Sequence, residues 1–176
     1  MVRLSRNPGT EPWWSRKARG RFDDAISLRL DPFGVCYAGD SIETAFAESV
    51  VHETSLFERG HYVVPAADVR ARWKVYFHHS RKKRLLLADL TGEGLKALGL
   101  NNDISAGEDY TVSQAWARAI DDCDPSWDGI RYVSRQLNNG YAYALFERTG
   151  LTKERSERLA DAELAALCDR FNVSVI

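Results

Sequence analysis

A carboxylate and an aromatic ring in one short stretch of this chain have the types and spacing to act on a small ligand. Glu48 lies in "ETAFAESVVHE", where Thr44 and Ala45, one helical turn earlier, are small and leave space beside the carboxylate. Tyr37 precedes it on a strand candidate, and its ring could stack on an aromatic ligand. The structural alternatives are a solvated helix face for Glu48 and a core position for Tyr37.

Two arginines near the amino terminus are candidates for binding an anion. Arg21 follows a glycine in "GRFDD", and Arg6 lies in "LSRNP". The planar fork of arginine suits a phosphate or a carboxylate. An exposed surface position is the alternative for each of them.

A hydroxyl occupies an unexpected place in "DGIRYVSRQLNNGYAYALFER", residues 128–148. The pattern predicts a β-hairpin that turns at Asn139-Gly140. Strand alternation puts Ile130, Tyr132 and Ser134 on one face. If that face is the inner one, Ser134 stands where a core would place valine or isoleucine. It is then either a site residue or a partner for a neighbouring strand.

The elements that must position these side chains mix strands and helices without strict βαβ alternation. This mixture favours an α+β class. Asp40 or Ser41 is expected to cap the helix that carries Glu48. The expected strands are 34–39, 72–79, 84–90 and the hairpin arms, and the expected helices are 40–50, 92–98, 111–120 and 161–171.

The clearest helix signal is "TVSQAWARAI", residues 111–120, with Thr111 as its cap. Its apolar residues share one face, which is expected to be buried. These residues are Val112, Ala115, Trp116, Ala119 and Ile120.

Length and composition indicate one globular domain. The chain has 176 residues, of which 44% are hydrophobic and 28% charged, and its net charge is −1. Near-neutral charge disfavours direct binding of nucleic acid, and no apolar run is long enough to predict a membrane span. No signal peptide is evident, and Cys36, Cys123 and Cys168 are odd in number and far apart. We therefore expect a cytoplasmic protein whose thiols are reduced and buried.

Common catalytic motifs do not occur. The chain contains no HExxH, GxSxG, P-loop or GxGxxG sequence. His78 and His79 point to opposite faces of the expected strand, so no metal site is predicted. The basic cluster "HHSRKKR", residues 78–84, is interpreted as a solvated turn rather than a contact for nucleic acid or an acidic partner.

Several blocks taken in order resemble the RES-domain family over about residues 3–148. They are "PWWSRKARGRFDD", "GVCYAGDSIETAFAES", "RLLLADLTGEGLKALGL", "EDYTVSQAWARAI", "WDGIRYVSRQ" and "ALFER". The resemblance implies one compact ADP-ribosyltransferase-like domain over 1–176, with small twisted sheets around a cleft and with residues 149–176 as a carboxy-terminal helical extension. Family members are typically toxins that are paired with an antitoxin carrying an Xre-like DNA-binding part.

The family motifs map onto the residues introduced above. The glutamate motif gives Tyr37 and Glu48, and the serine strand runs from Gly129 to Ser134. Arg21 in "GRFD" and Arg6 are alternatives for the family's arginine. The resemblance thus implies that Glu48, Arg21 and Ser134 are catalytic, and that Arg6, Arg21, Tyr37 and Ser134 bind the substrate.

The implied activity is cleavage of NAD⁺ at the nicotinamide–ribose bond, with NAD⁺ as substrate and no cofactor. Water or phosphate is the acceptor in a glycohydrolase or a phosphorylase. Two alternatives stay open: a mono-ADP-ribosyltransferase that modifies a protein, and an inactive binding module of the same fold. An antitoxin is expected to insert a segment into the cleft and to contact an apolar patch such as Trp13 and Trp14. The sequence leaves open whether the chain forms a homodimer or a toxin–antitoxin hetero-oligomer.

Overall fold

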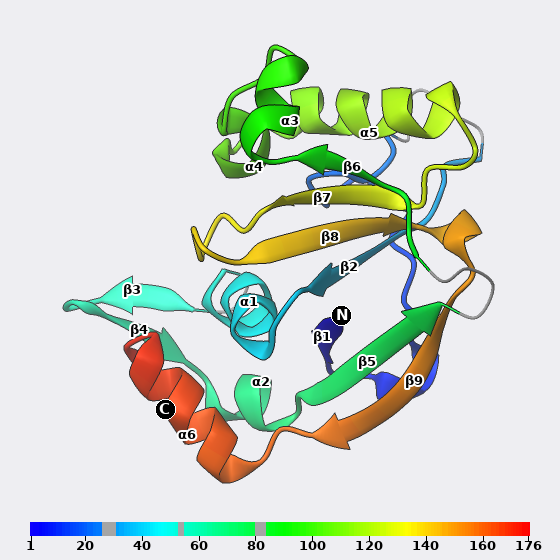
Figure 1. Ribbon diagram of the computed structural model, residues 1–176. Coiled ribbons are helices and arrows are strands. Elements are labelled where there is room, and N and C mark those ends of the chain that lie inside the picture. Colours follow the sequence, from blue (N-terminus) through cyan, green and yellow to red (C-terminus); the bar gives the residue numbers. More distant parts are fainter. Residues whose placement is uncertain (26–30, 53–54, 80–83) are drawn as a thin grey trace.

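One seven-stranded sheet forms the frame of the molecule, in the order β6-β7-β8-β2-β1-β5-β9 (Figure 1). The computed structural model describes residues 1–25, 31–52, 55–79 and 84–176. Neighbouring strands in this sheet are antiparallel except β6 and β7, which are parallel. The strands are β1 Val2–Ser5, β2 Val35–Gly39, β5 Trp73–His79, β6 Leu87–Leu90, β7 Gly129–Val133, β8 Tyr141–Phe146 and β9 Leu151–Arg158.

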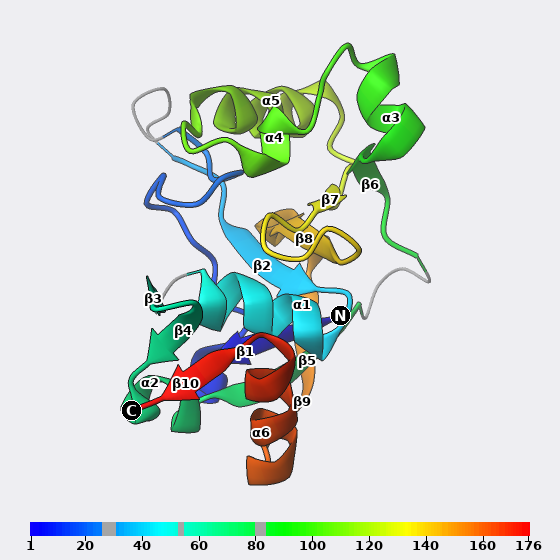
Figure 2. The same ribbon diagram turned by 90° about the vertical axis from the view of Figure 1, so that its left-hand side faces the viewer.

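A second, three-stranded sheet and the helices complete the fold. The small sheet contains β3 Leu56–Glu58, β4 His61–Val64 and β10 Val173–Val175 in the order β10-β4-β3. Figure 2 shows α6 and this sheet at the end of the molecule opposite α5. The helices are α1 Ile42–Phe46, α2 Ala66–Arg70, α3 Gly92–Ala97, α4 Asp103–Ala106, α5 Thr111–Cys123 and α6 Asp161–Arg170, with a π-helical turn η3 at Ala47–Val51 and 3-10 turns η1 at Pro8–Thr10 and η4 at Glu147–Thr149.

The large sheet opens between two of its central strands. β1 pairs with β5 along its whole length, but it pairs with β2 only where Val2 meets Gly39. Further along, the guanidinium of Arg3 donates a hydrogen bond to the carbonyl oxygen of Tyr37 at 3.1 Å. A side chain thus spans the two strands at a point where backbone pairing has stopped.

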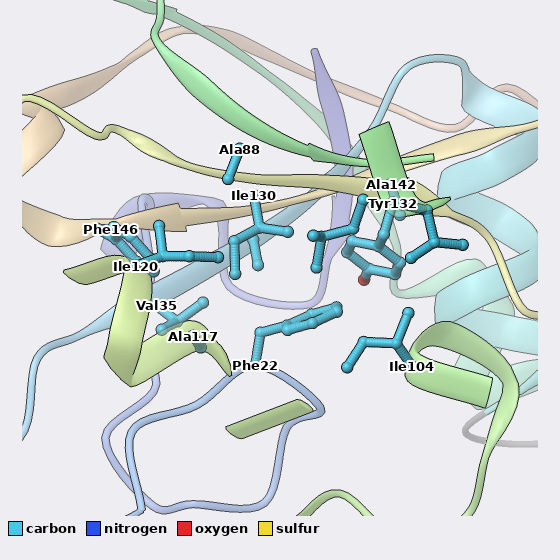
Figure 3. Packing of buried hydrophobic residues seen from close by; sticks show 13 residues of the cluster. Phe22, Val35, Ala88, Ile104, Ala117, Ile120, Ile130, Tyr132, Ala142 and Phe146 are labelled. Atoms are coloured by element: carbon cyan, nitrogen blue, oxygen red, sulfur yellow. The ribbon is translucent and has the colours of Figure 1, made fainter. Parts of the chain in front are cut away.

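Three hydrophobic clusters stabilise the sheet on its two faces. The first lies between the sheet and the helices α4 and α5 and includes Phe22, Ile130 and Tyr132 (Figure 3). The second joins β1 to α1, η3 and α6. Because side chains alternate along a strand, the remaining inward positions of β2, β5 and β8 form a third cluster on the opposite face. The helices packed on a mainly antiparallel sheet confirm the expected α+β class.

Helix α5 is rotated relative to the sequence prediction. Its buried residues are Ser113, Ala117 and Ile120, whereas Val112 is 57% exposed. The Ser113 hydroxyl donates to the carbonyl oxygen of Arg21 at 2.7 Å, and this bond holds the polar side of the helix against the loop before β2. The expectation of a buried apolar face is therefore wrong for Val112, Ala115 and Ala119, which are exposed. The expected cap is also wrong, because the cap residue is Tyr110 rather than Thr111.

The hairpin β7–β8 exists, but its two-residue turn at Asn139-Gly140 was a wrong prediction. Val133 pairs with Tyr141, so residues 134–140 form the connection. The Ser134 N–H donates to the carbonyl oxygen of Gly140 at 2.9 Å and closes this longer loop. The predicted inner face is nevertheless confirmed, because Ile130, Tyr132 and Ser134 are all buried.

The carboxy-terminal residues 149–176 are not a helical extension. β9 pairs with β5 along the edge of the large sheet, and β10 pairs in parallel with β4. Only α6 fulfils the helical expectation, and it begins after Ala160. The sequence of β9 contains many charged residues, which is why it was interpreted as a polar connection. The charges are compatible with a strand because β9 lies at the edge of the sheet and much of its surface is exposed.

Several remaining expectations have a definite outcome. The strands near 34–39 and 72–79 and the helix near 92–98 are confirmed. Cys36 and Cys168 are buried as expected, but Cys123 is exposed. Residues 80–83 of the basic cluster lie outside the described residues. Within the described residues, no helix is both long and apolar enough to cross a membrane.

Gly129 is required at the start of β7. Its φ is +152°, and an added Cβ would lie 2.3 Å from the carbonyl oxygen of Ala144 on β8. We expect Gly129→Ala to lower the free energy of unfolding by about 2–4 kcal/mol, because strain and overlap act together. Urea unfolding measures this loss.

Gly9→Ala is the matched control, because nothing lies within 4 Å of a Cβ added there. A Gly129→Ala protein as stable as Gly9→Ala would contradict the close packing of β7 against β8.

Candidate active site

A pocket of about 650 Å³ lies where β1 and β2 diverge, between the first and second hydrophobic clusters. Its wall contains residues of β1, β2, η3 and β7, together with the segment before Arg21 and Tyr110 at the start of α5. Of the candidate residues, Arg6, Arg21, Tyr37 and Glu48 line this pocket. The structure therefore brings together side chains from four separate parts of the sequence.

Glu48 projects from a π-helical turn. The Ser41 hydroxyl accepts the Thr44 N–H at 3.1 Å and caps α1, which confirms one of the two predicted caps. The helix then widens, and the His52 N–H donates to the carbonyl oxygen of Ala47, five residues earlier. Single π-helical turns are frequent at functional sites because they redirect one side chain. Here the half-buried Glu48 is directed towards the end of β7.

Ser134 fixes the carboxylate of Glu48. Its hydroxyl donates to Glu48 Oε1 at 2.5 Å and accepts the N–H groups of Leu137 at 3.1 Å and Gln136 at 3.3 Å. The two accepted bonds orient the hydroxyl so that its single proton points at the carboxylate. Ser134 is 1% exposed and does not line the pocket, so in this geometry it positions Glu48 rather than contacting a ligand.

Arg21 is a buried cation held by neutral groups. Its guanidinium donates to the carbonyl oxygen of Gly107 at 2.8 Å and lies 4.6 Å from the ring centre of Tyr110. Among the described residues it forms no ion pair with a carboxylate. Its positive charge is therefore available to an anion in the pocket.

Tyr37 presents its ring to the pocket while its hydroxyl is engaged elsewhere. The hydroxyl donates to Asp23 at 2.8 Å and accepts the Phe22 N–H at 2.9 Å. Burial and the nearby Asp23 carboxylate raise the pKa of Tyr37 well above its usual value. A Cβ on Gly20 would lie 2.5 Å from this hydroxyl oxygen, so a residue with a side chain at position 20 would overlap the Tyr37 ring.

Arg6 lies at the edge of the pocket and forms an ion pair with Asp68. A deeper arginine, Arg3, was missed by the sequence analysis. It lies 3.3 Å from the nearly buried carboxylate of Glu11 and reaches across to β2. Its place on β1 between two buried apolar residues, Val2 and Leu4, was a signal that could have been followed.

The pocket concentrates positive charge. Among the described residues, six arginines and two carboxylates line it, although the whole chain has a net charge of −1. The arginines are Arg3, Arg6, Arg19, Arg21, Arg72 and Arg135, and the carboxylates are Glu11 and Glu48. A lining of this kind attracts an anionic ligand such as a phosphate ester. Within the described residues, no group of three His, Cys, Asp or Glu side chains is placed to hold a metal ion.

Other residues named in the sequence analysis lie elsewhere. Asn139 is exposed in the loop and does not line the pocket. Trp13 lines the pocket and is 52% exposed. Trp14 instead packs against the third cluster, so the two tryptophans do not share one environment.

The fold and the pocket define a class of α+β protein in which a glutamate held by a serine faces an arginine-rich cavity. A family model described as the RES domain matches residues 1–165. The chain therefore belongs to the RES domain family, as its sequence blocks indicated, and the match extends beyond residue 148 into β9 and α6.

Two further comparisons agree with this assignment. The chain is 33% identical over 96 residues to "Probable toxin y4kH" of Sinorhizobium fredii (strain NBRC 101917 / NGR234), a match that covers 52% of this chain and 75% of that protein. Its fold is similar to that of a chain in the crystal structure of the M. tuberculosis MbcT–MbcA toxin–antitoxin complex, with a TM-score of 0.64 and 19% identity. That match covers 94% of this chain and 86% of the other, so it shows a shared fold over nearly the whole length.

Replacement of Ser134 tests how much its hydrogen bonds to Glu48 and to its own loop stabilise the protein. In Ser134→Ala, Glu48 loses its donor and the Leu137 N–H loses its acceptor, so we expect a loss of about 1–3 kcal/mol in the free energy of unfolding. Ser174→Ala, at an exposed position on β10, is expected to stay within about 0.5 kcal/mol of the wild type. Equal stability of the two variants would show that the buried hydroxyl makes no net contribution.

Proposed function

We propose that this chain cleaves NAD⁺ at the nicotinamide–ribose bond, with Glu48 as the residue beside the reacting carbon. The observation that carries the proposal is the Glu48 carboxylate, which Ser134 holds in place in a pocket otherwise rich in arginine. Glu11, the other carboxylate of the lining, is paired with Arg3, and an acid such as Glu48 in a cationic cavity suits a ligand that combines a positive reacting centre with negative phosphates.

The chemistry requires little from the protein beyond charge and position. The bond between the ribose C1′ and the pyridinium nitrogen breaks, and both electrons stay with nicotinamide, which leaves as a neutral molecule. The ribose becomes oxocarbenium-like and positive, as in glycoside cleavage. Glu48 stabilises this developing charge, and the acceptor then bonds to C1′ and releases a proton to solvent.

The remaining candidates have roles that match their surroundings. Arg21 is available to the pyrophosphate because the described residues that hold it are neutral, namely backbone carbonyl groups and a tyrosine ring. Arg3 and Arg6 are already paired with carboxylates, and they supply weaker attraction for the same group. The ring of Tyr37 lines the pocket as an aromatic wall for nicotinamide.

The names of the similar proteins support a biological role. One is called a probable toxin, and the other belongs to a toxin–antitoxin complex. We therefore propose that this chain is the toxin of such a module and that a cognate antitoxin, expected to be Xre-like, neutralises it. The half-exposed Trp13 at the pocket offers an apolar contact for that partner.

Replacement of Glu48 tests the catalytic proposal. We expect the wild type to release nicotinamide from NAD⁺. The rate of release by Glu48→Gln is expected to be at least about 100-fold lower, because glutamine keeps the shape of the side chain but not its negative charge. Glu154→Gln is the control, since Glu154 is exposed on β9 outside the pocket. Chromatography of nicotinamide, with and without inorganic phosphate, measures the rate and identifies the acceptor.

The outcomes separate the alternatives for this fold. Release that requires phosphate indicates a phosphorylase, and release in water alone indicates a glycohydrolase. Transfer of labelled ADP-ribose to a protein would replace both with a mono-ADP-ribosyltransferase. Absence of all three, from folded protein free of an inhibitor, would contradict the enzymatic proposal and leave a binding module.

Expression in bacteria tests the toxin proposal. Induction of the wild-type chain alone is expected to lower cellular NAD⁺ and stop growth, whereas Glu48→Gln at the same protein level should do neither. Glu154→Gln should behave as the wild type. Growth arrest by Glu48→Gln equal to that of the wild type would disconnect toxicity from this pocket.

A further inference from the structure

Tyr132 is a buried residue of the pocket that the proposed mechanism does not yet use. It lies on β7, two residues before Ser134, and only 5% of its surface is exposed. Its ring packs on that of Phe22, and both side chains are labelled in Figure 3. The two ring centres are 4.7 Å apart. Because Tyr132 also lines the cavity, its small exposed part faces the pocket.

The hydroxyl of Tyr132 has no hydrogen-bond partner among the described residues. The contrast with Tyr37 is direct, since the hydroxyl of Tyr37 makes two hydrogen bonds. The Tyr132 oxygen is not among the fully buried side-chain atoms that lack a partner, so this polar end of a largely buried side chain is open to the pocket. A partner that enters the pocket from outside accounts for the position of this group.

The charges around Tyr132 define what that partner is. Burial and the Glu48 carboxylate raise its pKa well above the usual value, against a smaller opposite effect of Arg21, while Tyr110 and Asp23 add to the rise. The hydroxyl therefore keeps its proton and acts as a donor. Glu48 Oε1 accepts from Ser134, and no hydrogen bond joins Tyr132 to Glu48. The hydroxyl proton is thus free for an acceptor that enters the pocket near Glu48.

We propose that the Tyr132 hydroxyl donates a hydrogen bond to an oxygen of the nicotinamide riboside half of the substrate. This inference rests on the proposed cleavage of NAD⁺, because Glu48 identifies the half that lies in this part of the pocket. The two oxygen classes in reach of a donor there are the ribose oxygens and the carboxamide oxygen of nicotinamide. Tyr132 is then a catalytic residue that touches substrate, whereas Ser134 is a positioning residue.

Tyr132→Phe removes the hydroxyl alone and keeps the ring on Phe22. We expect kcat/KM for NAD⁺ to fall about 10- to 100-fold, because the ligand oxygen loses its donor in a buried site. The thermal midpoint should not fall, since no protein hydrogen bond is broken. Tyr143→Phe is the matched control, because Tyr143 packs in the third cluster on the opposite face of the sheet and does not line the pocket.

Nicotinamide itself, used as an inhibitor of NAD⁺ cleavage, distinguishes the two acceptors. A higher inhibition constant of nicotinamide for Tyr132→Phe than for the wild type identifies the carboxamide oxygen as the acceptor. An unchanged inhibition constant together with a reduced kcat/KM identifies a ribose oxygen. Wild-type cleavage with Tyr132→Phe equal to Tyr143→Phe overturns this inference and leaves the proposed function intact. Absence of cleavage by the wild type overturns both.

Discussion

The divergence of β1 from β2 is the constraint on which the rest of this structure depends. The two strands are neighbours in one sheet, yet their backbones pair only at Val2 and Gly39. The gap that follows would leave backbone groups unpaired, and the Arg3 guanidinium satisfies one of them, the carbonyl oxygen of Tyr37. A cation in the wall of the pocket is therefore a consequence of the same strand geometry that opens it.

The two sides of this opening are joined through a polar contact. Glu48 belongs to the π-helical turn that packs on the second cluster, and Ser134 directly follows the strand β7, which packs on the first. The Ser134 hydroxyl binds both the Glu48 carboxylate and the backbone of its own loop. The contact thus ties the orientation of the carboxylate to the closure of residues 134–140. This coupling answers why a small hydroxyl occupies an inward position.

Local patterns predicted the elements and faces on which these residues lie, whereas their assignment to one site came from the ordered sequence blocks that resemble the RES-domain family. Tyr37 and Glu48 follow from a strand and a capped helix, and the inward position of Ser134 follows from strand alternation. Contacts between distant segments were not accessible in this way. Arg3 binds a carbonyl 34 residues away, and the rotation of α5 depends on Ser113 binding a carbonyl 92 residues away. The hairpin turn was predicted wrongly for a local reason, because the Ser134 hydroxyl accepts the N–H groups of Gln136 and Leu137 and begins the longer loop before Asn139-Gly140.

The π-helical turn at Ala47–Val51 makes the length of this segment as important as its composition. Successive residues of a helix are separated by roughly 100° of rotation. Loss of one residue between the Ser41 cap and Glu48 would therefore turn the carboxylate away from Ser134. A gene with such a three-nucleotide deletion would still encode every side chain of the pocket, yet its product would no longer join the acid to its hydroxyl donor. Inspection of the pocket residues alone would not reveal the defect.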